Sequence, residues 1–168
     1  MKISMYSASV PVFVRSLNNL AAILEKAAAH AVVKKIDPAV LVNFRLFPDM
    51  LPLSKQIQIA SDGAKGGVAR LAGAEPPAYE DNEISIADLI ARLRKTVAYL
   101  ETIKPEQVDG SEDKTVSWKT QTSTRTMQGM AYLLSHVTPN VYFHVTTAYA
   151  ILRHCGVELG KQDFLRNT

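Results

Sequence analysis

The chain has 168 residues, 47% hydrophobic and 21% charged, a composition that excludes a disordered chain and suits one globular domain. Its 19 basic and 16 acidic residues are spread along the sequence, without the clustered basic patch that is typical of nucleic-acid binders. The single cysteine, Cys155, excludes an intrachain disulfide. Because we find neither a secretion signal nor an apolar run of about 20 residues, we expect a cytoplasmic protein with no membrane partner.

The first predicted helix begins near residue 10, where apolar residues recur at alternating steps of three and four. Such spacing places them on one face of a helix, and a strand would not keep it. Pro11 fits a first helical turn, or else it marks a kink. Asp37-Pro38 then predicts a break and a restart, with Asp as the cap and Pro at the first helical position. The residues of this apolar face are Val10, Val14, Leu17, Ala21, Leu24, Ala28 and Ala31.

A second apolar face runs from Met50 to Leu71, with Pro48-Asp49 suited to the start of a helix and Gly73 to its end. Three glycines interrupt the helical stretch, and each costs about 1 kcal/mol relative to Ala. Either a neighbouring helix approaches closely there, or the helix leaves space for a ligand. The glycines are Gly63, Gly66 and Gly67.

Residues 74–84 are rich in Pro and acidic residues and predict a loop. Ser85 then caps a third helix, whose apolar face runs from Ile86 to Leu100 and which ends by Lys104-Pro105. Residues 105–125 lose the helical spacing and become β-branched, aromatic and polar, which favours a small hairpin or an extended excursion.

The last apolar face is the longest, from Met127 to Cys155, and Gly156 is a natural stop. Pro139 interrupts it, so we expect a kink or two helices end to end. Four amphipathic segments joined by modest loops predict an all-α four-helix bundle in a single domain, residues 1–168, with a possible small β-hairpin between helices three and four.

The best candidate site is a polar stripe on the last helix, made of His136, Asn140 and His144. His144 occupies a position that the apolar face assigns to the core, so its imidazole needs a hydrogen-bond partner or a metal. The partner could be a tyrosine or a carboxylate across the bundle. Side chains that could face the stripe from the second helix are those of Asp49, Gln56 and Asp62.

Spacing limits how these groups could act together. Asn140 and His144 share a helix face because they lie four residues apart. His136 and His144 lie about 12 Å apart along a straight helix, too far to bind one ion unless Pro139 bends the chain. Cys155 lies at a helix C-terminus, where the partial negative charge disfavours a thiolate, so we expect it to be buried rather than nucleophilic.

The C-terminal block, PNVYFHVTTAY over residues 139–149 continued through residues 151–165, resembles the signature of an uncharacterised bacterial family of unknown function. That family is related to the DinB/YfiT-like metal-dependent bundles. The segment 48–53, followed by Gln56 and Ala60, looks like its second-helix motif. The resemblance covers essentially the whole chain, and the C-terminal block is its more specific part.

The resemblance implies a DinB-like bundle with up-down-down-up order, frequently dimeric. In the wider superfamily, one histidine of the second helix and two at i, i+4 on the last helix hold a divalent metal, often nickel or zinc. Only the last of these carries over, onto His144, because Asn140 stands four residues earlier and the second helix contains no histidine. Some superfamily members are thiol-dependent transferases or glutathione-linked isomerases.

Three functional hypotheses follow. The first is an interior pocket around His144 that binds a small molecule without a complete metal site and needs no cofactor. The second is a metal- or thiol-dependent hydrolase or transferase that uses His144 and Asn140, with Gln56 or Asp49. The third is a non-catalytic structural or regulatory homodimer.

Overall fold

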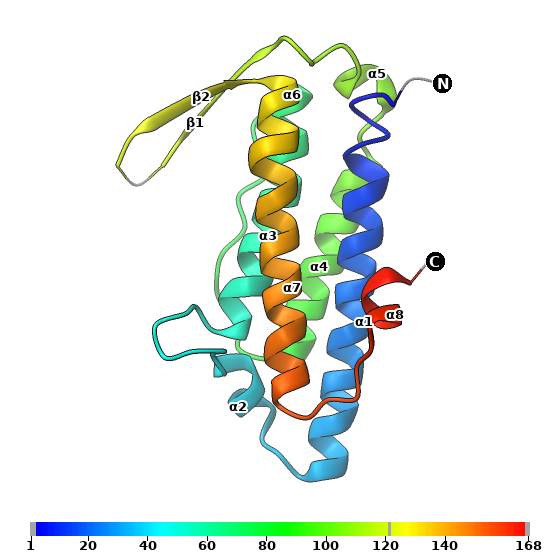
Figure 1. Ribbon diagram of the computed structural model, residues 1–168, viewed down its shortest axis with the longest axis vertical. Coiled ribbons are helices and arrows are strands. Elements are labelled where there is room, and N and C mark those ends of the chain that lie inside the picture. Colours follow the sequence, from blue (N-terminus) through cyan, green and yellow to red (C-terminus); the bar gives the residue numbers. More distant parts are fainter. Residues whose placement is uncertain (1–2, 121, 167–168) are drawn as a thin grey trace.

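The computed structural model describes residues 3–120 and 122–166. Four long helical segments carry the fold (Figure 1), the last being a continuous run of α6, the π-helical turn η1 and α7. Shorter helices and one hairpin join or follow them. The elements are α1 (Val10–Lys34), α2 (Pro38–Asn43), α3 (Leu53–Leu71), α4 (Ile86–Glu101), α5 (Pro105–Val108), β1 (Thr115–Lys119), β2 (Thr124–Gln128), α6 (Gly129–Tyr132), η1 (Leu133–Val137), α7 (Thr138–His154) and α8 (Lys161–Leu165).

The long helices lie side by side, and α1 packs on α4 while α3 packs on both α4 and α7. Helices α1 and α7 run down the molecule in Figure 1, whereas α3 and α4 run up it. Since α3 and α4 are parallel, residues 72–85 must return along the length of the bundle to connect them. Asp81 and Glu83 of this crossover form ion pairs with Arg92 of α4.

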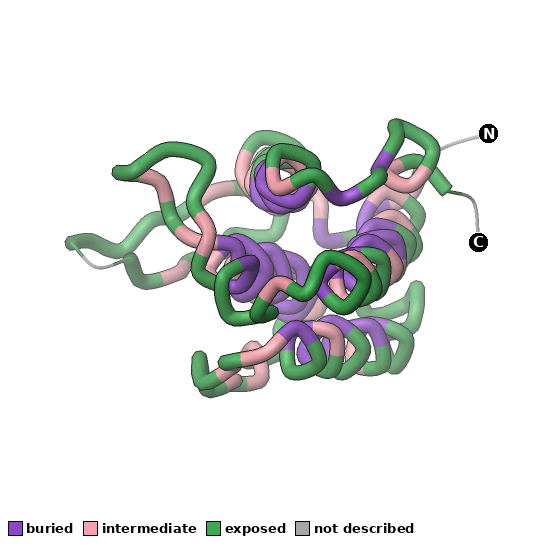
Figure 2. Tube along the Cα trace, turned by 90° about the horizontal axis from the view of Figure 1, so that it is seen from below, coloured by how far each residue is buried: buried purple, intermediate pink, exposed green. Residues whose placement is uncertain are grey.

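The predicted apolar faces form the core, except at Met130 and Leu134, which keep the spacing of the last face but are exposed. Seen along the bundle, their buried sides turn inward toward one another (Figure 2). Leu17, Ile57, Leu93 and Val141 each come from a different long helix and are fully buried. Withdrawing such side chains from water stabilises the fold by roughly 1.5–3 kcal/mol each, before the entropy cost of ordering them.

The local start signals act as predicted. Pro11 lies in the first turn of α1, and the Asp37 carboxylate accepts a hydrogen bond from the Ala39 N–H at 2.9 Å, capping α2. Ser85 and Asp88 form a reciprocal capping box at the start of α4. Gly156 ends α7 with a φ of 85°, a conformation that favours glycine.

Two predicted boundaries are wrong. Helix α3 begins at Leu53 and not at Pro48-Asp49, because Pro52 is in extended backbone and a proline disfavours helical backbone in the residue before it. Met127 belongs to β2, where it pairs with Val116, and not to the last helix. The expected hairpin between the third and last long helices is confirmed, so the all-α prediction is corrected to a mainly helical fold with one antiparallel hairpin.

The interruption expected at Pro139 takes the form of a π-helical turn just before it. Pro139 has no N–H to donate, and it lies in the first turn of α7, where none is needed. In η1 the Thr138 N–H bonds to the Leu133 carbonyl, five residues back. The helix therefore continues without a break while its faces rotate. Over the residues described, no helix combines the length and apolarity that crossing a membrane requires.

Candidate functional site

His144 lies on the buried side of α7, against the start of α3. Its Nδ1 lies 2.7 Å from Gln56 Oε1, and Gln56 Nε2 donates to the Leu51 carbonyl at 3.0 Å. Because the amide nitrogen already donates to that carbonyl, the amide oxygen is an acceptor and His144 Nδ1 carries the proton. Nε2 of His144 is then the nitrogen with the free lone pair.

Burial controls the charge of His144. The side chain of Gln56 is 2% exposed and that of His144 8%, and this burial lowers the pKa of the imidazole. The ring is therefore neutral at pH 7, and among the described residues no side chain hydrogen bonds to Nε2. Such a nitrogen can accept a hydrogen bond, or take a proton from an O–H, N–H or S–H group held against it.

Asn140, the second residue of the predicted stripe, lies beside α3. A Cβ placed on Gly63 would be 3.2 Å from Asn140 Nδ2 and 3.2 Å from Val141 Cγ2. At Gly67 the close approach is tighter, since a Cβ there would lie 2.4 Å from Val137 Cγ1. Gly63 and Gly67 accordingly let α3 and the last helix pack closely, which was the first of the two explanations that the sequence allowed for these glycines.

His136 does not belong to the same site as His144. Its ring stacks on Trp118 at a centroid distance of 4.7 Å and on Tyr132 at 5.7 Å, under the hairpin. The pKa of His136 is lowered by burial and then by the charges of Arg125 and Arg70. The three-residue stripe is therefore corrected: η1 and the hairpin draw its first member into an aromatic cluster.

The remaining candidates on and near α3 separate in the same way. Gln56 contacts His144, whereas Asp49 is exposed in the loop before α3 and no contact among the described residues joins it to His144. Asp62 pairs with Arg92 and Lys65, away from the stripe. Cys155 is partly buried, and burial raises the pKa of its thiol, which agrees with a packing role.

The residues at this site do not fit the nickel or zinc of the wider superfamily. The donors are one imidazole and the carboxamides of Gln56 and Asn140, whereas these metals prefer several imidazole, thiolate or carboxylate ligands. Nδ1 of His144 is engaged by Gln56. Within residues 3–120 and 122–166, no group of three or more His, Cys, Asp or Glu side chains is placed to hold an ion.

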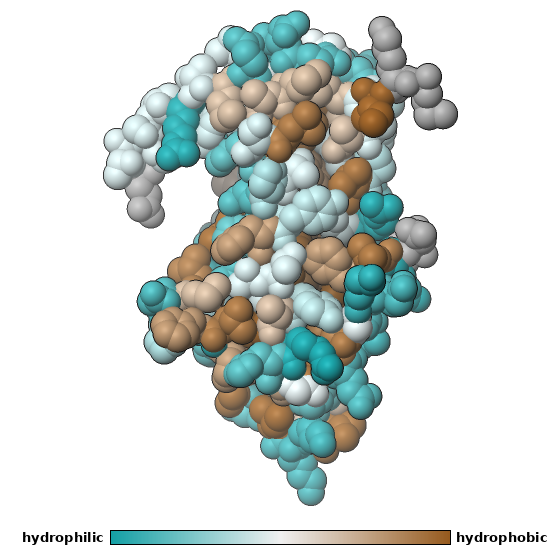
Figure 3. Space-filling model, viewed as in Figure 1, coloured by the Kyte–Doolittle hydropathy of each residue, from teal (hydrophilic) through white to brown (hydrophobic). Residues whose placement is uncertain are grey.

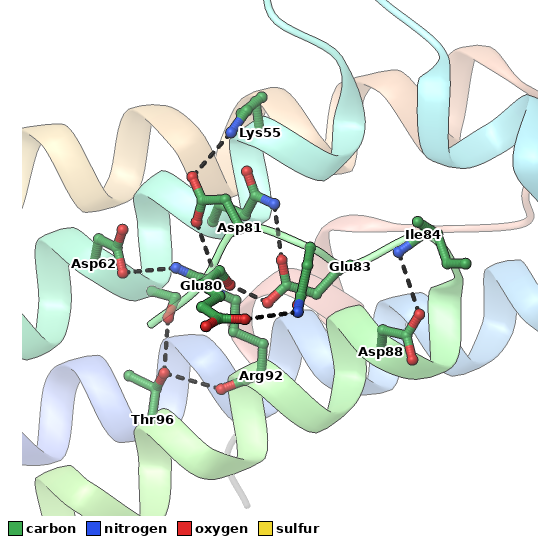
Figure 4. A network of polar contacts seen from close by, with 12 residues as sticks. Lys55, Asp62, Glu80, Asp81, Glu83, Ile84, Asp88, Arg92 and Thr96 are labelled. Carbon is green, nitrogen blue, oxygen red and sulfur yellow. Dashed lines mark hydrogen bonds and ion pairs between the residues drawn. The ribbon is translucent and has the colours of Figure 1, made fainter. Parts of the chain in front are cut away.

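A second polar cluster, centred on Arg92 of α4, ties down the crossover (Figure 4). The Arg92 guanidinium bonds to Asp62 of α3 at 2.8 Å and, in the crossover, to Glu83 at 2.8 Å and Asp81 at 3.1 Å. It also donates to the Glu80 carbonyl at 3.0 Å. Arg92 is thus surrounded by acceptors of its own chain.

The charges of this cluster stabilise one another. Burial works against the charge of Arg92, but the hydrogen bonds that Arg92 donates to Glu83 and Asp62 outweigh it and raise the pKa of Arg92. Burial likewise opposes the charge of Glu83, but its hydrogen bonds to Arg92 and Gln58 lower the pKa of the carboxyl. We interpret the cluster as a strap that holds residues 79–83 against α3 and α4. The sequence signal for this cluster is the acidic loop of residues 74–84, which is followed by a helix that carries Arg92, Arg94 and Lys95. The sequence does not show which of these basic residues pairs with the loop.

His144 lines none of four cavities in the described part of the chain, so none of these is the predicted interior pocket around His144. The largest, about 730 Å³, opens beside the Arg92 cluster and is lined by Tyr79, Glu83 and Lys95 among others. A ligand of His144 would therefore contact the small exposed part of the imidazole ring, next to the exposed side chain of Phe143.

The geometry agrees with the comparisons to known proteins. A family described as a domain of unknown function, DUF1993, matches residues 5–165. A solved structure of a DinB family member protein from Shewanella denitrificans is 40% identical to this chain, with a TM-score of 0.88, and the match covers 97% of this chain and 92% of that one. No curated protein matches. The chain therefore has a DinB-like fold and belongs to the DUF1993 family.

Proposed function

We propose that this protein binds a small organic molecule that donates an O–H, N–H or S–H group to Nε2 of His144, without a bound metal. The observation that carries the proposal is the chain of hydrogen bonds from the Leu51 carbonyl through Gln56 to His144 Nδ1. It holds the ring in one tautomer and leaves a neutral acceptor at the edge of the core. The absence of the superfamily's other two histidines from the sequence supports a metal-free site.

Matched donors test the ligand class. Benzyl alcohol and benzyl mercaptan each carry a single donor hydrogen, and the S-methyl derivative of the second, benzyl methyl sulfide, carries none. In ¹⁵N-detected NMR titrations we expect the two donors, but not the methylated compound, to shift His144 Nε2. The shifts should vanish in His144→Phe and persist in His154→Phe, which changes an exposed histidine of the same helix. Equal shifts from the methylated compound would contradict the proposal.

Metal analysis tests the metal-free part separately. Protein purified without added metal should contain no stoichiometric nickel or zinc. If one equivalent of either metal is present and disappears in His144→Ala, the metal-free proposal is wrong and a metal-dependent hydrolase or transferase takes its place.

A homodimer is a second candidate function, and the outer side of α6 and α7 favours it. Residues 129–152 contain no Asp, Glu, Lys or Arg, although the helix lies on the surface. Met130 is 48% exposed, Leu134 55% and Phe143 57%. Figure 3 shows mostly pale or brown surface along these helices. An exposed helix face without charge is typical of a surface that a partner covers.

Sedimentation velocity at micromolar concentration tests the dimer. We expect a dimer that becomes a monomer in Phe143→Lys or Leu134→Lys, because the introduced charge would be buried in the interface. Val33→Lys is the matched control, since Val33 is 77% exposed at the end of α1 and away from this face. A wild-type protein that sediments as a monomer would exclude this candidate.

A further inference from the structure

Buried basic side chains differ in how their charge is balanced. Arg92 and Lys65 are both nearly inaccessible, and each pairs with the carboxylate of Asp62. Arg70, near the end of α3, is half-buried, and its Nη1 donates only to the Tyr132 hydroxyl, at 3.3 Å. Within the described residues, no carboxylate lies within ion-pair distance of Arg70. A half-buried guanidinium without an anion loses hydration and gains little in return.

The backbone is shaped to hold this guanidinium. A Cβ on Gly66, one turn earlier on α3, would lie 2.8 Å from Arg70 Nη1. The guanidinium therefore folds back onto its own helix at a position that glycine keeps open. Tyr132, which receives its hydrogen bond, is 2% exposed and lies deep in the core. Arg70 is thus fixed in place although no counter-charge holds it.

A cavity of about 510 Å³ opens in front of Arg70, between the end of α3, the start of the crossover and the hairpin. Trp118 of β1 forms one wall, and its ring stacks on His136 at 4.7 Å and packs at a tilt against Tyr132 at 4.8 Å. Lys119 adds a second positive charge to the lining, and Glu75 is its acidic residue. The wall and the cation are therefore both positioned before any ligand arrives.

We propose that this cavity binds a planar aromatic acid, with its carboxylate on Arg70 and its ring against Trp118. A guanidinium binds a carboxylate through two parallel hydrogen bonds, and an indole face packs well on a flat ring. The volume suits a compound of one or two rings. This site is independent of the one proposed at His144, because Gln56 and Arg70 lie near opposite ends of α3, about 20 Å apart along the helix.

Trp118 is the only tryptophan of the chain, so its fluorescence and its indole N–H resonance report on this cavity alone. The probes are benzoate, benzamide with the same ring but no charge, and acetate with the charge but no ring. We expect saturable changes with benzoate at a Kd on the order of 1 mM. Both controls should bind at least about tenfold more weakly, since each lacks one of the two contacts.

Two variants test the role of Arg70. Arg70→Met removes the charge, and Gly66→Ala keeps the charge but displaces the guanidinium, so both should weaken benzoate binding about tenfold or more. Arg153→Met, at the exposed end of α7, is the matched control and should bind as wild type does. Three outcomes would each overturn the proposal: no saturable change with benzoate, equal binding of benzamide, or unchanged binding in both Arg70→Met and Gly66→Ala.

Discussion

The identity of one side chain, that of Gln56, decides how His144 behaves. A carboxylate at this position would favour the protonated imidazole, whereas a carboxamide accepts the Nδ1 hydrogen without adding charge. Burial is then the dominant influence, and it lowers the pKa of His144. The hydrogen bond of 2.7 Å therefore orients the ring and keeps it neutral at the same time.

Replacing Gln56 by glutamate reverses this balance. In Gln56→Glu we expect the pKa of His144 to rise, because the new carboxylate stabilises the charged ring. The measurement is the titration of the His144 ring carbons by NMR. Gln162→Glu, in the exposed helix α8, is the control and should leave that titration as it is in the wild type. A His144 titration that does not move in Gln56→Glu would show that the contact is not formed in solution.

At the scale of elements, α3 and the π turn η1 pack closely at Gly67. Gly67→Ala would place a methyl group 2.4 Å from Val137 Cγ1, so one helix has to move. We expect a loss of about 1–3 kcal/mol in the free energy of unfolding, measured with urea. The double variant Gly67→Ala/Val137→Ala should lose less than the sum of the single variants, because removing the valine methyls frees the space.

Gly160→Ala is the control for that variant, since a Cβ there meets nothing within 4 Å. It should change the free energy of unfolding by less than about 0.5 kcal/mol. Strictly additive effects of Gly67→Ala and Val137→Ala would mean that the two residues are not packed together.

No residue of the crossover, 72–85, is fully buried, and Arg92 ties the segment to α3 and α4. Arg92→Met removes the partner of Asp62, Asp81 and Glu83. Because Asp62 and Asp81 are 43% and 41% exposed and only Glu83 is left buried without a cation, we expect a loss of about 1–3 kcal/mol in the free energy of unfolding. By hydrogen–deuterium exchange we expect residues 78–84 to exchange faster in Arg92→Met than in the wild type, whereas α1 should exchange at the same rate in both proteins. Arg94→Met breaks the exposed pair with Glu25 and should cost no more than about 1 kcal/mol. Equal protection of residues 78–84 in the wild type and in Arg92→Met would contradict the interpretation that the Arg92 cluster holds the crossover against α3 and α4.

Over the whole molecule, two histidines couple stability to pH. Burial lowers the pKa of His144, and burial followed by the charges of Arg125 and Arg70 lowers that of His136, each from an ordinary value of 6.5. Below pH 6.5 the unfolded chain therefore binds protons that the folded chain does not. The contribution of these two histidines to the free energy of unfolding is complete above pH 6.5. It falls as the pH drops from 6.5 toward their lower pKa values in the folded state.

Urea unfolding between pH 7.5 and 5.5 tests this coupling. We expect the free energy of unfolding to fall with decreasing pH, at no more than about 1.4 kcal/mol per pH unit for each histidine. His144→Gln should flatten the dependence, and His154→Gln, which replaces an exposed histidine, serves as the control. A His144→Gln variant that keeps the full wild-type dependence would refute the role of His144. Burial opposes the charge of Asp81 and Glu83, but a hydrogen bond from Lys55 to Asp81 and one from Arg92 to Glu83 lower the pKa values of these carboxyls, so they act only in more acidic solution.

Much of the fold can be predicted from the sequence because the signals are local. The alternating three- and four-residue steps identify the long helices, and Asp37, Ser85 and Gly156 mark where helices begin or end. The loss of that spacing marks the hairpin. The predictions were wrong at Pro48-Asp49 and at Met127, where a following proline or a partner strand outweighs the helical pattern.

Less of the candidate site can be predicted. The apolar spacing alone places His144 in the core, and it offers Gln56, with Asp49 and Asp62, as a side chain that could face it. It cannot tell that an amide, and not a tyrosine or carboxylate, would be the partner. It also groups His136 with His144, since the rotation introduced by η1 leaves no mark in the spacing.

The sequence by itself therefore determined the helices, their buried faces and the burial of one histidine, because these depend on periodicity along a short stretch of chain. Only the tertiary structure decided which side chains meet: Gln56 with His144, Asp62 with Arg92, and Trp118 with His136. Those pairings depend on the rotation and register of elements far apart in the chain. That register is set by the packing of all the helices together, which no local pattern contains.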